Sequence, residues 1–229
     1  MTQFDTLETT IGITFSNKTL LENVFIHRSY LNEHKNYHLA SNEKLEFLGD
    51  SVLSLITSIY LYKNFPELQE GDYTDIKAAI VRTESLAEVG ATLELGKYLF
   101  LSKGEEKGKG RSNTNILADC FEALVAAVFI DKSFDAAYDF VLKHLFMNKL
   151  QYIVENKLYL SPKSRLQEVL QAKHRVLPVY KTISELGPEH SKEFKVSVFL
   201  KDKLLGVGTA SSKKHAEEQA AKNALEKMS

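Results

Sequence analysis

The 229-residue chain has 44% hydrophobic and 26% charged residues, a composition typical of globular proteins that excludes extensive disorder outside the tails. Its single cysteine, Cys120, excludes an intramolecular disulfide and a zinc site built from cysteines. The first residues are acidic and polar, and the longest uninterrupted apolar run, 123–130, is too short to span a bilayer. We therefore expect no targeting signal and no membrane insertion, and the cysteine count suits a reducing cytosol.

The formal net charge of −1 hides an uneven distribution of charge. Residues 161–229 contain 13 Lys and Arg against 8 Asp and Glu, whereas residues 1–160 contain 16 against 22. A basic region suits a polyanion, and an acidic region suits the capture of a metal ion. The two parts are therefore expected to have different tasks.

Apolar residues recur every three or four positions between residues 20 and 150, a spacing typical of α-helices. Asn17 is a candidate N-cap, and Asn-Phe-Pro at 64–66 predicts the end of one helix. The first part of the chain is therefore predicted to be all helical.

Two segments in this region are marked by glycine. Gly71 and Asp72 are expected to precede a helix that carries residues 76–86. The segment 103–115, with three glycines and four basic residues, is predicted to be one long loop. This loop is either a solvated connector or a contact with a nucleic-acid backbone.

The segment NEKLEFLGDSVL at 42–53 places three carboxylates in an otherwise apolar stretch. Glu43, Glu46 and Asp50 are separated by three, four and seven residues, which puts them on one helix face. Burying a charged side chain among apolar residues costs free energy, so these acids require an explanation.

A second segment, ILADCFEALVAAVFID at 116–131, repeats this arrangement. Asp119 and Glu122 lie about one helical turn apart among Leu, Ala, Val and Phe. Glu70 is a further candidate for the same acidic group. The two segments therefore predict two helices that each present carboxylates on one side.

These carboxylates favour a hard divalent cation. Two like charges about 4 Å apart repel by about 4 kcal/mol at an effective dielectric of 20, so a cluster needs a cation, protons or basic side chains. Oxygen ligands without histidine suit Mg²⁺ or Mn²⁺ rather than zinc, and such a metal suits phosphodiester hydrolysis. The alternative is that these acids cap and decorate solvated helices, as most Asp and Glu do. The residues by themselves leave both possibilities open.

Leu160-Ser161-Pro162 punctuates the chain where its charge changes sign, with Ser161 as a candidate N-cap and Pro162 as the first helical residue. Alternating segments such as FKVSVFL predict strands in the part that follows. The predicted order is α-β-β-β-α: a helix at 163–173, strands at 178–184, 193–200 and 204–210, and a helix from Ser212.

The segment at 42–53 resembles the signature of the ribonuclease III family. HRSY at 27–30, FPELQEGDYT at 65–74 and the acidic segment at 116–131 resemble other blocks of this family, in the same order. Residues 161–229 resemble a double-stranded-RNA-binding domain through SRLQEVLQ, GPEH followed by KEFKVSV, and GVGTASSKKHAEEQAA. The arrangement is that of the short bacterial-type members.

The resemblance implies a mostly α, all-helical and dimeric endonuclease domain at 1–157 and a small α+β RNA-binding domain at 161–229. It implies a metal-dependent endoribonuclease that hydrolyses phosphodiester bonds of double-stranded RNA and leaves 5′-phosphate, 3′-hydroxyl and two-nucleotide 3′ overhangs. Processing of ribosomal RNA precursors and structured transcripts in the cytoplasm would follow. The expected cofactor is Mg²⁺, with Mn²⁺ as a substitute. The expected partners are double-stranded RNA and a second copy of the chain, with no membrane and no other protein.

The resemblance also assigns roles to individual positions. It makes Asp50 and Glu122 the catalytic pair least open to replacement, and it implies that Lys109 and Arg111 contact RNA. Although HRSY at 27–30 matches the family, we expect His27 and Arg28 to brace the fold rather than to take part in cutting. The implied metal ligands are Glu46, Asp50, Asp119 and Glu122, the additional acids are Glu43 and Glu70, the dimer contact is Phe47, and the RNA contacts are Ser164, Gln167, Glu168, His190, Lys213 and Lys214.

Two other functions compete with this one. A protein of the same fold that binds duplex RNA without cutting it would be free to lose Asp50 or Glu122, yet both positions hold acids. A DNA-directed nuclease would use the same acids, but the RNA-binding resemblance of residues 161–229 counts against it. Unchanged RNA processing in an Asp50→Asn variant would favour the binder, whereas loss of processing would favour the nuclease.

Overall fold

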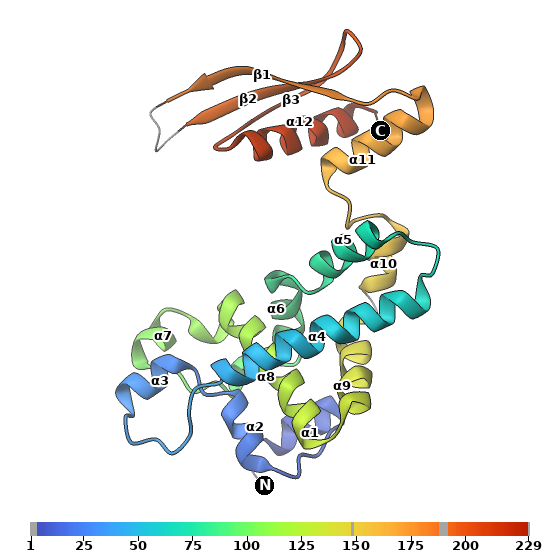
Figure 1. The fold of residues 1–229 in the computed structure, drawn as a ribbon. Coiled ribbons are helices and arrows are strands. Elements are labelled where there is room, and N and C mark those ends of the chain that lie inside the picture. The colour runs from blue at the N-terminus through green and yellow to red at the C-terminus, as the bar shows by residue number, and fades with distance from the viewer. Residues whose placement is uncertain (1–3, 148, 188–191, 229) are drawn as a thin grey trace. The chain divides into compact units, whose positions relative to one another are not determined.

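The computed structural model describes residues 4–147, 149–187 and 192–228. Contacts between Cα atoms divide the chain into two compact units, Met1–Tyr159 and Leu160–Ser229 (Figure 1). Each unit has a hydrophobic core of its own.

Among the described residues of the first unit, the regular secondary structure is helical apart from an isolated parallel bridge between Ile26 and Phe100, which confirms the prediction for this part. Its helices are α1 (Asp5–Ile11), α2 (Lys18–Val24), α3 (Arg28–Glu33), α4 (Glu43–Asn64), α5 (Glu70–Ile80), α6 (Thr83–Thr92), α7 (Lys103–Lys107), α8 (Thr114–Asp131), α9 (Phe134–Val141) and α10 (Leu150–Glu155), with single turns η1 (Leu95–Lys97), η2 (Gly110–Ser112) and η3 (Leu142–Phe146).

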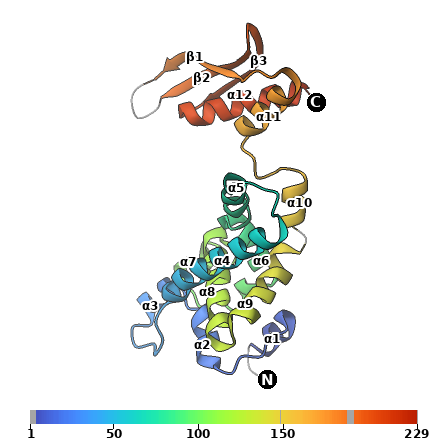
Figure 2. The same ribbon diagram turned by 45° about the vertical axis from the view of Figure 1, so that its right-hand side comes forward.

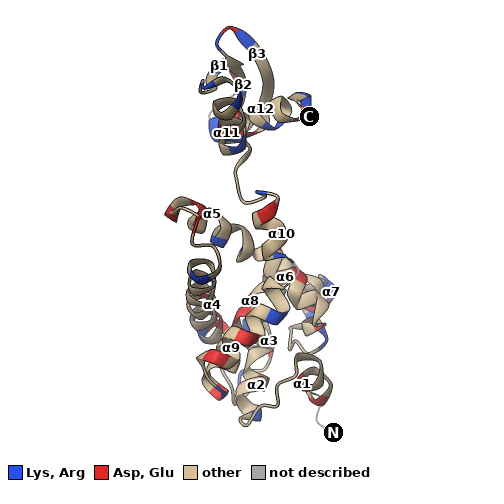
Figure 3. Cartoon of the chain, turned by 90° about the vertical axis from the view of Figure 1, so that its right-hand side faces the viewer, with Lys and Arg blue, Asp and Glu red and all other residues tan. Residues whose placement is uncertain are grey.

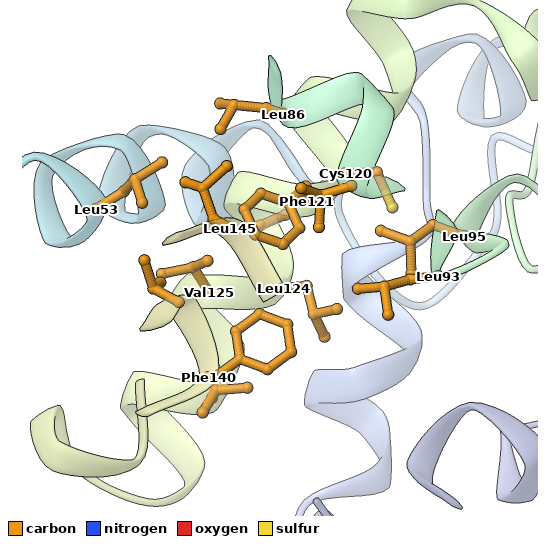
Figure 4. Packing of buried hydrophobic residues seen from close by; sticks show 14 of the residues in the cluster. Leu53, Leu86, Leu93, Leu95, Cys120, Phe121, Leu124, Val125, Phe140 and Leu145 are labelled. Atoms are coloured by element: carbon orange, nitrogen blue, oxygen red, sulfur yellow. The ribbon is translucent and has the colours of Figure 1, made fainter. Parts of the chain in front are cut away.

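Helices α4 and α8 lie side by side in the middle of this unit (Figures 1 and 2). Helix α8 is buried almost all round because apolar residues occupy every face of its central turns. In Figure 4, Phe121 and Leu124 of α8 lie in a cluster that includes Leu53 of α4 and Phe140 of α9. Burial of each such side chain contributes about 1.5–3 kcal/mol, so this cluster holds the two long helices together.

Several predicted boundaries are confirmed. The side chain of Asn17 accepts a hydrogen bond from the backbone N–H of Leu20 at 3.0 Å, as expected of an N-cap. Helix α4 ends at Asn64, where Phe65 and Pro66 were expected to stop it.

The single helix predicted over residues 76–86 is wrong. The structure has two helices there, α5 and α6, separated by an extended Arg82. Gly71 and Asp72 lie inside α5, where the Asp72 carboxylate accepts a hydrogen bond from the backbone N–H of Gln69 at 3.1 Å. No glycine or proline marks the break at Arg82, so the usual signals of a helix end are missing there.

The long loop predicted over residues 103–115 is also wrong. The segment contains α7, the turn η2 and the N-cap of α8, Asn113. The Asn113 side chain accepts hydrogen bonds from the backbone N–H groups of Asn115 and Ile116 at 2.9 and 3.2 Å. One polar residue of the predicted loop, Asn113, therefore serves as a helix cap.

Among the described residues, α4 alone is long and apolar enough to cross a membrane by length and composition. Its buried side includes Leu53, Ile56 and Leu61 and packs against the rest of the core, and its first two turns carry three acids. Core helices pass the same test of length and composition.

The second unit has the predicted α-β-β-β-α order, with α11 (Pro162–His174), β1 (Val179–Leu186), β2 (Glu193–Leu200), β3 (Lys203–Ala210) and α12 (Lys213–Met228). Its antiparallel sheet has the order β1-β2-β3. Both helices contribute to its core, through Leu166 and Leu170 of α11 and the alanines of α12. Basic residues are visible on α11 in Figure 3.

Helix α12 packs closely on β3 because small residues face each other. A Cβ on Gly206 would lie 2.4 Å from the carbonyl oxygen of Ala220, and a Cβ on Gly208 would lie 2.3 Å from that of Ala216. Only glycine fits at these two positions. The contact fixes the first turns of α12 against the sheet.

Candidate active site

Helices α4 and α8 bring three carboxylates together. Glu46 of α4 and Asp119 and Glu122 of α8 each offer one oxygen, and these oxygens lie within 4.8 Å of one another. All three side chains are partly buried. Oxygen ligands in this geometry suit Mg²⁺ or Mn²⁺.

Gly49 allows this close approach. A Cβ at this position would lie 1.9 Å from the carbonyl oxygen of Glu122. The missing side chain lets the backbone of α4 rest on that of α8, one turn from Glu46. The glycine in the motif at 42–53 therefore has a steric role beside the acids.

Burial raises the pKa values of the three carboxyl groups, and repulsion from neighbouring acids adds to this effect at Glu46 and Glu122. Desolvation by burial is the largest cause at each position. For Glu122, burial together with the charges of Asp50, Asp119 and Glu46 raises the pKa to about 8. His27 and Arg28 act in the opposite direction on Asp119. A cation bound among these groups would remove the repulsion and displace the protons.

Asp50 lies at the edge of this group. It follows Glu46 by one helical turn, is exposed, and does not belong to the set of three mutually close oxygens. Its charge nevertheless raises the pKa values of Glu46 and Glu122. The structure thus brings three of the four expected ligands together and leaves the fourth beside them.

The two additional acids have different positions. Glu43 lies near Glu46, accepts a hydrogen bond from the Ser41 hydroxyl at 2.6 Å and faces Arg28 across 3.8 Å. Glu70, at the start of α5, lies apart from the three-carboxylate group and lines a separate pocket of about 190 Å³. The structure of one chain therefore brings Glu43 to the site and not Glu70.

A polar cleft of about 620 Å³ adjoins the acidic group. Residues of α3, α4, α7 and the start of α8 line it, and these elements lie together at the N-terminal end of α4 (Figures 1 and 2). Sequence reasoning did not identify Asn32, Glu105, Asn113 or Asn115 as part of this cleft. The spacing of Asn115, four residues before Asp119, could have placed it on the same face of α8. The lining residues are His27, Arg28, Ser29, Asn32, Asn42, Glu43, Glu46, Glu105, Asn113, Asn115, Ile116 and Asp119.

His27 has the contacts of a bracing residue. Its Nδ1 caps α3 by accepting from the backbone N–H of Ser29 and lies 2.8 Å from the Ser29 hydroxyl. That hydroxyl accepts a hydrogen bond from the backbone N–H of Ser102 at 3.1 Å, which ties α3 to the segment before α7.

Arg111 is held by the protein itself. Its guanidinium donates to the carbonyl oxygens of Gly96 and Lys97 at 2.9 and 3.3 Å and pairs with Glu106. Lys109 is exposed. The expected RNA contact of Arg111 therefore competes with contacts that stabilise the turn before α8.

The expected RNA contacts of the second unit lie on two helices. Ser164, Gln167 and Glu168 are on α11, where the Ser164 hydroxyl lies 3.0 Å from that of Ser161. Lys213 and Lys214 are exposed in the first turn of α12. His190 lies outside the described residues.

An apolar stripe runs along the exposed side of α4. Phe47 is 78% exposed, and Leu55 and Tyr62, eight and fifteen residues further on, are also exposed. These spacings place all three on one face of the helix. A row of large exposed apolar side chains of this kind is typical of an interaction surface.

The raised pKa of Glu122 predicts that the metal-free protein loses stability as the pH rises. The folded chain keeps a proton on Glu122 up to about pH 8, whereas the unfolded chain releases it near the ordinary value of 4.5. This contribution to stability is complete below pH 4.5 and is lost between 4.5 and 8. Because the group is partly solvated, we expect a loss of about 1–2 kcal/mol, measured by urea unfolding in EDTA at about pH 5 and about pH 8.5.

Glu122→Gln supplies the control for this pH dependence. Glutamine cannot ionise, so the variant should lose less stability than the wild type over the same pH interval. Identical pH profiles for the two proteins would show that Glu122 does not carry this change.

Comparisons with known proteins agree with the two units. A family model described as Ribonuclease-III-like matches residues 17–149, and one described as a double-stranded RNA binding motif matches residues 162–228. A protein of Dehalococcoides mccartyi named Ribonuclease 3 is 43% identical over 97% of this chain and 93% of its own length. A protein of the same name from Oceanobacillus iheyensis is 44% identical over 97% of this chain and 96% of its own length.

The fold comparison gives the same result for the helical unit. The nuclease domain of ribonuclease III from Campylobacter jejuni, in a structure that describes flexibility in a region involved in its dimer formation, is similar with a TM-score of 0.60 and 32% identity. The match covers 64% of this chain and 99% of that domain. These matches, together with the acidic site between α4 and α8, show that the chain belongs to the ribonuclease III family of metal-dependent endonucleases that act on double-stranded RNA.

Proposed function

We propose that the protein is a homodimeric, Mg²⁺-dependent endoribonuclease that cuts both strands of double-stranded RNA. The products would carry 5′-phosphate and 3′-hydroxyl ends with two-nucleotide 3′ overhangs. Residues 1–157 form the nuclease domain and residues 161–229 the RNA-binding domain in this proposal. The convergence of Glu46, Asp119 and Glu122 between α4 and α8 is the observation that carries it.

The donor set fits a hard divalent metal. Glu46, Asp119 and Glu122 offer only oxygen, and burial raises the pKa of each carboxyl group, so a divalent cation would favour their charged forms. When bound, Mg²⁺ supplies an activated water and neutralises charge on the phosphate. Asp50, which lies at the edge of the group, is assigned as the fourth metal ligand. Asp50 and Glu122 are assigned as the catalytic pair.

The exposed stripe of α4 supports the homodimer. Phe47, Leu55 and Tyr62 would be removed from water by a second copy of the same helix face. A dimer would carry two acidic sites, one for each strand of the duplex. Phe47 is the residue that we assign to the contact with the partner.

The biological task that we propose is the processing of ribosomal RNA precursors and of other structured transcripts in the cytoplasm. The RNA-binding motif match over residues 162–228 supports duplex RNA as the substrate. Such domains read the shape and 2′-hydroxyl groups of A-form RNA across about 16 base pairs rather than its sequence.

Incubation with a labelled RNA duplex of about 30 base pairs, long enough to exceed the span of the RNA-binding domain, tests this function. With Mg²⁺ we expect staggered cuts in both strands, and with EDTA no cuts, because the carboxylates alone cannot activate water. A matched DNA duplex should stay intact. Tight binding without cleavage under Mg²⁺ or Mn²⁺ would make the protein a duplex-RNA binder and overturn the proposal.

Lys213 and Lys214 provide a test of the RNA-binding unit. Replacing both with alanine removes two exposed positive charges from the first turn of α12. We expect weaker binding to every duplex and a slope of log K against log salt that is smaller by about 2, since each phosphate contact contributes about 1. Electrophoretic mobility shifts at several salt concentrations measure this. The melting temperature of the variant should equal that of the wild type. An unchanged affinity for RNA would show that the two lysines do not contact RNA.

A further inference from the structure

The cleft beside the acidic group is lined by residues of different chemistry. Besides acids such as Glu46 and Asp119, its lining includes Arg28 and Asn32 of α3 and Asn115 of α8. Its volume of about 620 Å³ lies in the range of ligand-binding pockets. The cleft, called here the α3–α8 cleft, thus combines acids with a cation and neutral amides.

Arg28 lines this cleft, and its contacts with the rest of the protein are weak. Its side chain is 74% exposed, and its ion pair with Glu43 spans 3.8 Å. Its charge is nevertheless close enough to act on the carboxylates of Glu46 and Asp119. Arg111 shows the contrast, because two backbone carbonyl groups hold its guanidinium. The contacts expected of a bracing residue are therefore found at His27 and not at Arg28.

Asn115 lies in the first turn of α8, four residues before Asp119. The Asn113 side chain accepts a hydrogen bond from its backbone N–H at 2.9 Å, which fixes the start of the helix. The Asn115 side chain is exposed and lines the cleft. An amide offers both a donor and an acceptor.

A polyanionic strand that reaches the acidic group meets repulsion from its carboxylates. An arginine beside them offsets this repulsion and offers two parallel N–H donors to one phosphate. A 2′-hydroxyl is both donor and acceptor, which matches an amide side chain.

We propose that the α3–α8 cleft holds the RNA strand next to the bond that is cut, with Arg28 binding a backbone phosphate and Asn115 hydrogen-bonding a 2′-hydroxyl group. This inference rests on the proposed metal site of Glu46, Asp119 and Glu122. It assigns substrate-contacting residues within the nuclease unit, in addition to the contacts expected from the RNA-binding unit.

Steady-state cleavage by the full chain tests Arg28. Arg28→Ala should raise KM by about 10-fold or more and lower the salt slope of log KM by about 1, as expected for the loss of one phosphate contact. Arg28→Lys should recover part of the loss, since it keeps the charge without the bidentate geometry. Arg82→Ala is the matched control, because Arg82 is 62% exposed and pairs with Glu84 at 3.9 Å outside the cleft.

Asn115→Ala is tested on two substrates, an all-RNA duplex and the same duplex with 2′-deoxynucleotides around the cut. If Asn115 binds a 2′-hydroxyl, the wild type should be less active on the deoxy substrate than on the all-RNA duplex. The Asn115→Ala variant should be nearly equally active on the two substrates, because the hydrogen bond is already lost. Fully additive losses would overturn the role of Asn115.

The outcomes separate the two levels of the argument. Failure of the wild type to cut RNA would overturn the proposed function. Cutting by the wild type together with an Arg28→Ala variant that matches Arg82→Ala in KM and salt slope would overturn the inference alone. Melting temperatures of all variants show whether a loss reflects folding, and recovery in Arg28→Lys then identifies the charge contact.

Discussion

Glu122→Gln is expected to lower the rate of duplex-RNA cleavage by at least about 10³-fold, a loss typical of removing one well-placed electrostatic contact from a transition state. Glutamine keeps the shape of the side chain but removes the charge from the group of three oxygens. The variant should therefore fold and bind RNA while cutting slowly. Single-turnover cleavage with saturating Mg²⁺ measures the rate, and mobility shifts measure the binding.

Glu84→Gln is the matched control for this experiment. Glu84 is an exposed acid in the first turn of α6, outside the acidic group. Its replacement should leave the cleavage rate within about 2-fold, which corresponds to about 0.4 kcal/mol. Wild-type rates in the Glu122→Gln variant would remove Glu122 from the mechanism.

Gly49→Ala is expected to destabilise the first unit by about 3 kcal/mol or more and to weaken metal binding. The new Cβ would lie 1.9 Å from the carbonyl oxygen of Glu122, and both groups belong to helical backbone that cannot rotate away. Helices α4 and α8 must separate, which moves Glu46 from Asp119 and Glu122. Urea unfolding measures the stability, and calorimetric titration with Mg²⁺ or Mn²⁺ measures the metal affinity.

Gly71→Ala provides the opposite case within the same unit. Gly71 lies in helix α5, and no heavy atom beyond the adjacent residues and the backbone of its own helix lies within 4 Å of the position of its Cβ. Alanine should therefore raise stability by up to about 1 kcal/mol through its higher helix propensity. Equal effects at the two glycines would contradict a steric role for Gly49.

Local sequence signals predicted much of the secondary structure. Asn17 caps α2 as expected, α4 ends before Pro66, and Ser161 with Pro162 begins α11. The alternation in FKVSVFL predicted β2 with the bounds that the structure has. These features depend on residues a few positions apart, so a linear reading is sufficient for them.

The same kind of signal was wrong at two places. The break between α5 and α6 at Arg82 has no glycine or proline, and the segment 103–115, rich in glycine and charge, forms α7 and the cap of α8. Arg28 was expected to brace the fold, and its side chain is 74% exposed and lines the cleft. Composition marks a segment as polar but does not specify which of its residues cap a helix.

The sequence by itself determined which acids share a helix face. The spacing of Glu43, Glu46 and Asp50 in α4, and that of Asp119 and Glu122 in α8, follows from the 3.6-residue period of a helix. The tertiary structure decided which of these acids meet, because that depends on how closely α4 and α8 pack at Gly49.

Packing also decided which candidates stay outside the central group. Asp50 lies at its edge, and Glu70 lies on another part of the unit. Helical periodicity is a local property of the chain, whereas the contact between two helices depends on the shape of every side chain in the core. The types of ligand could therefore be predicted from the sequence, whereas their grouping into one site depends on the folded chain.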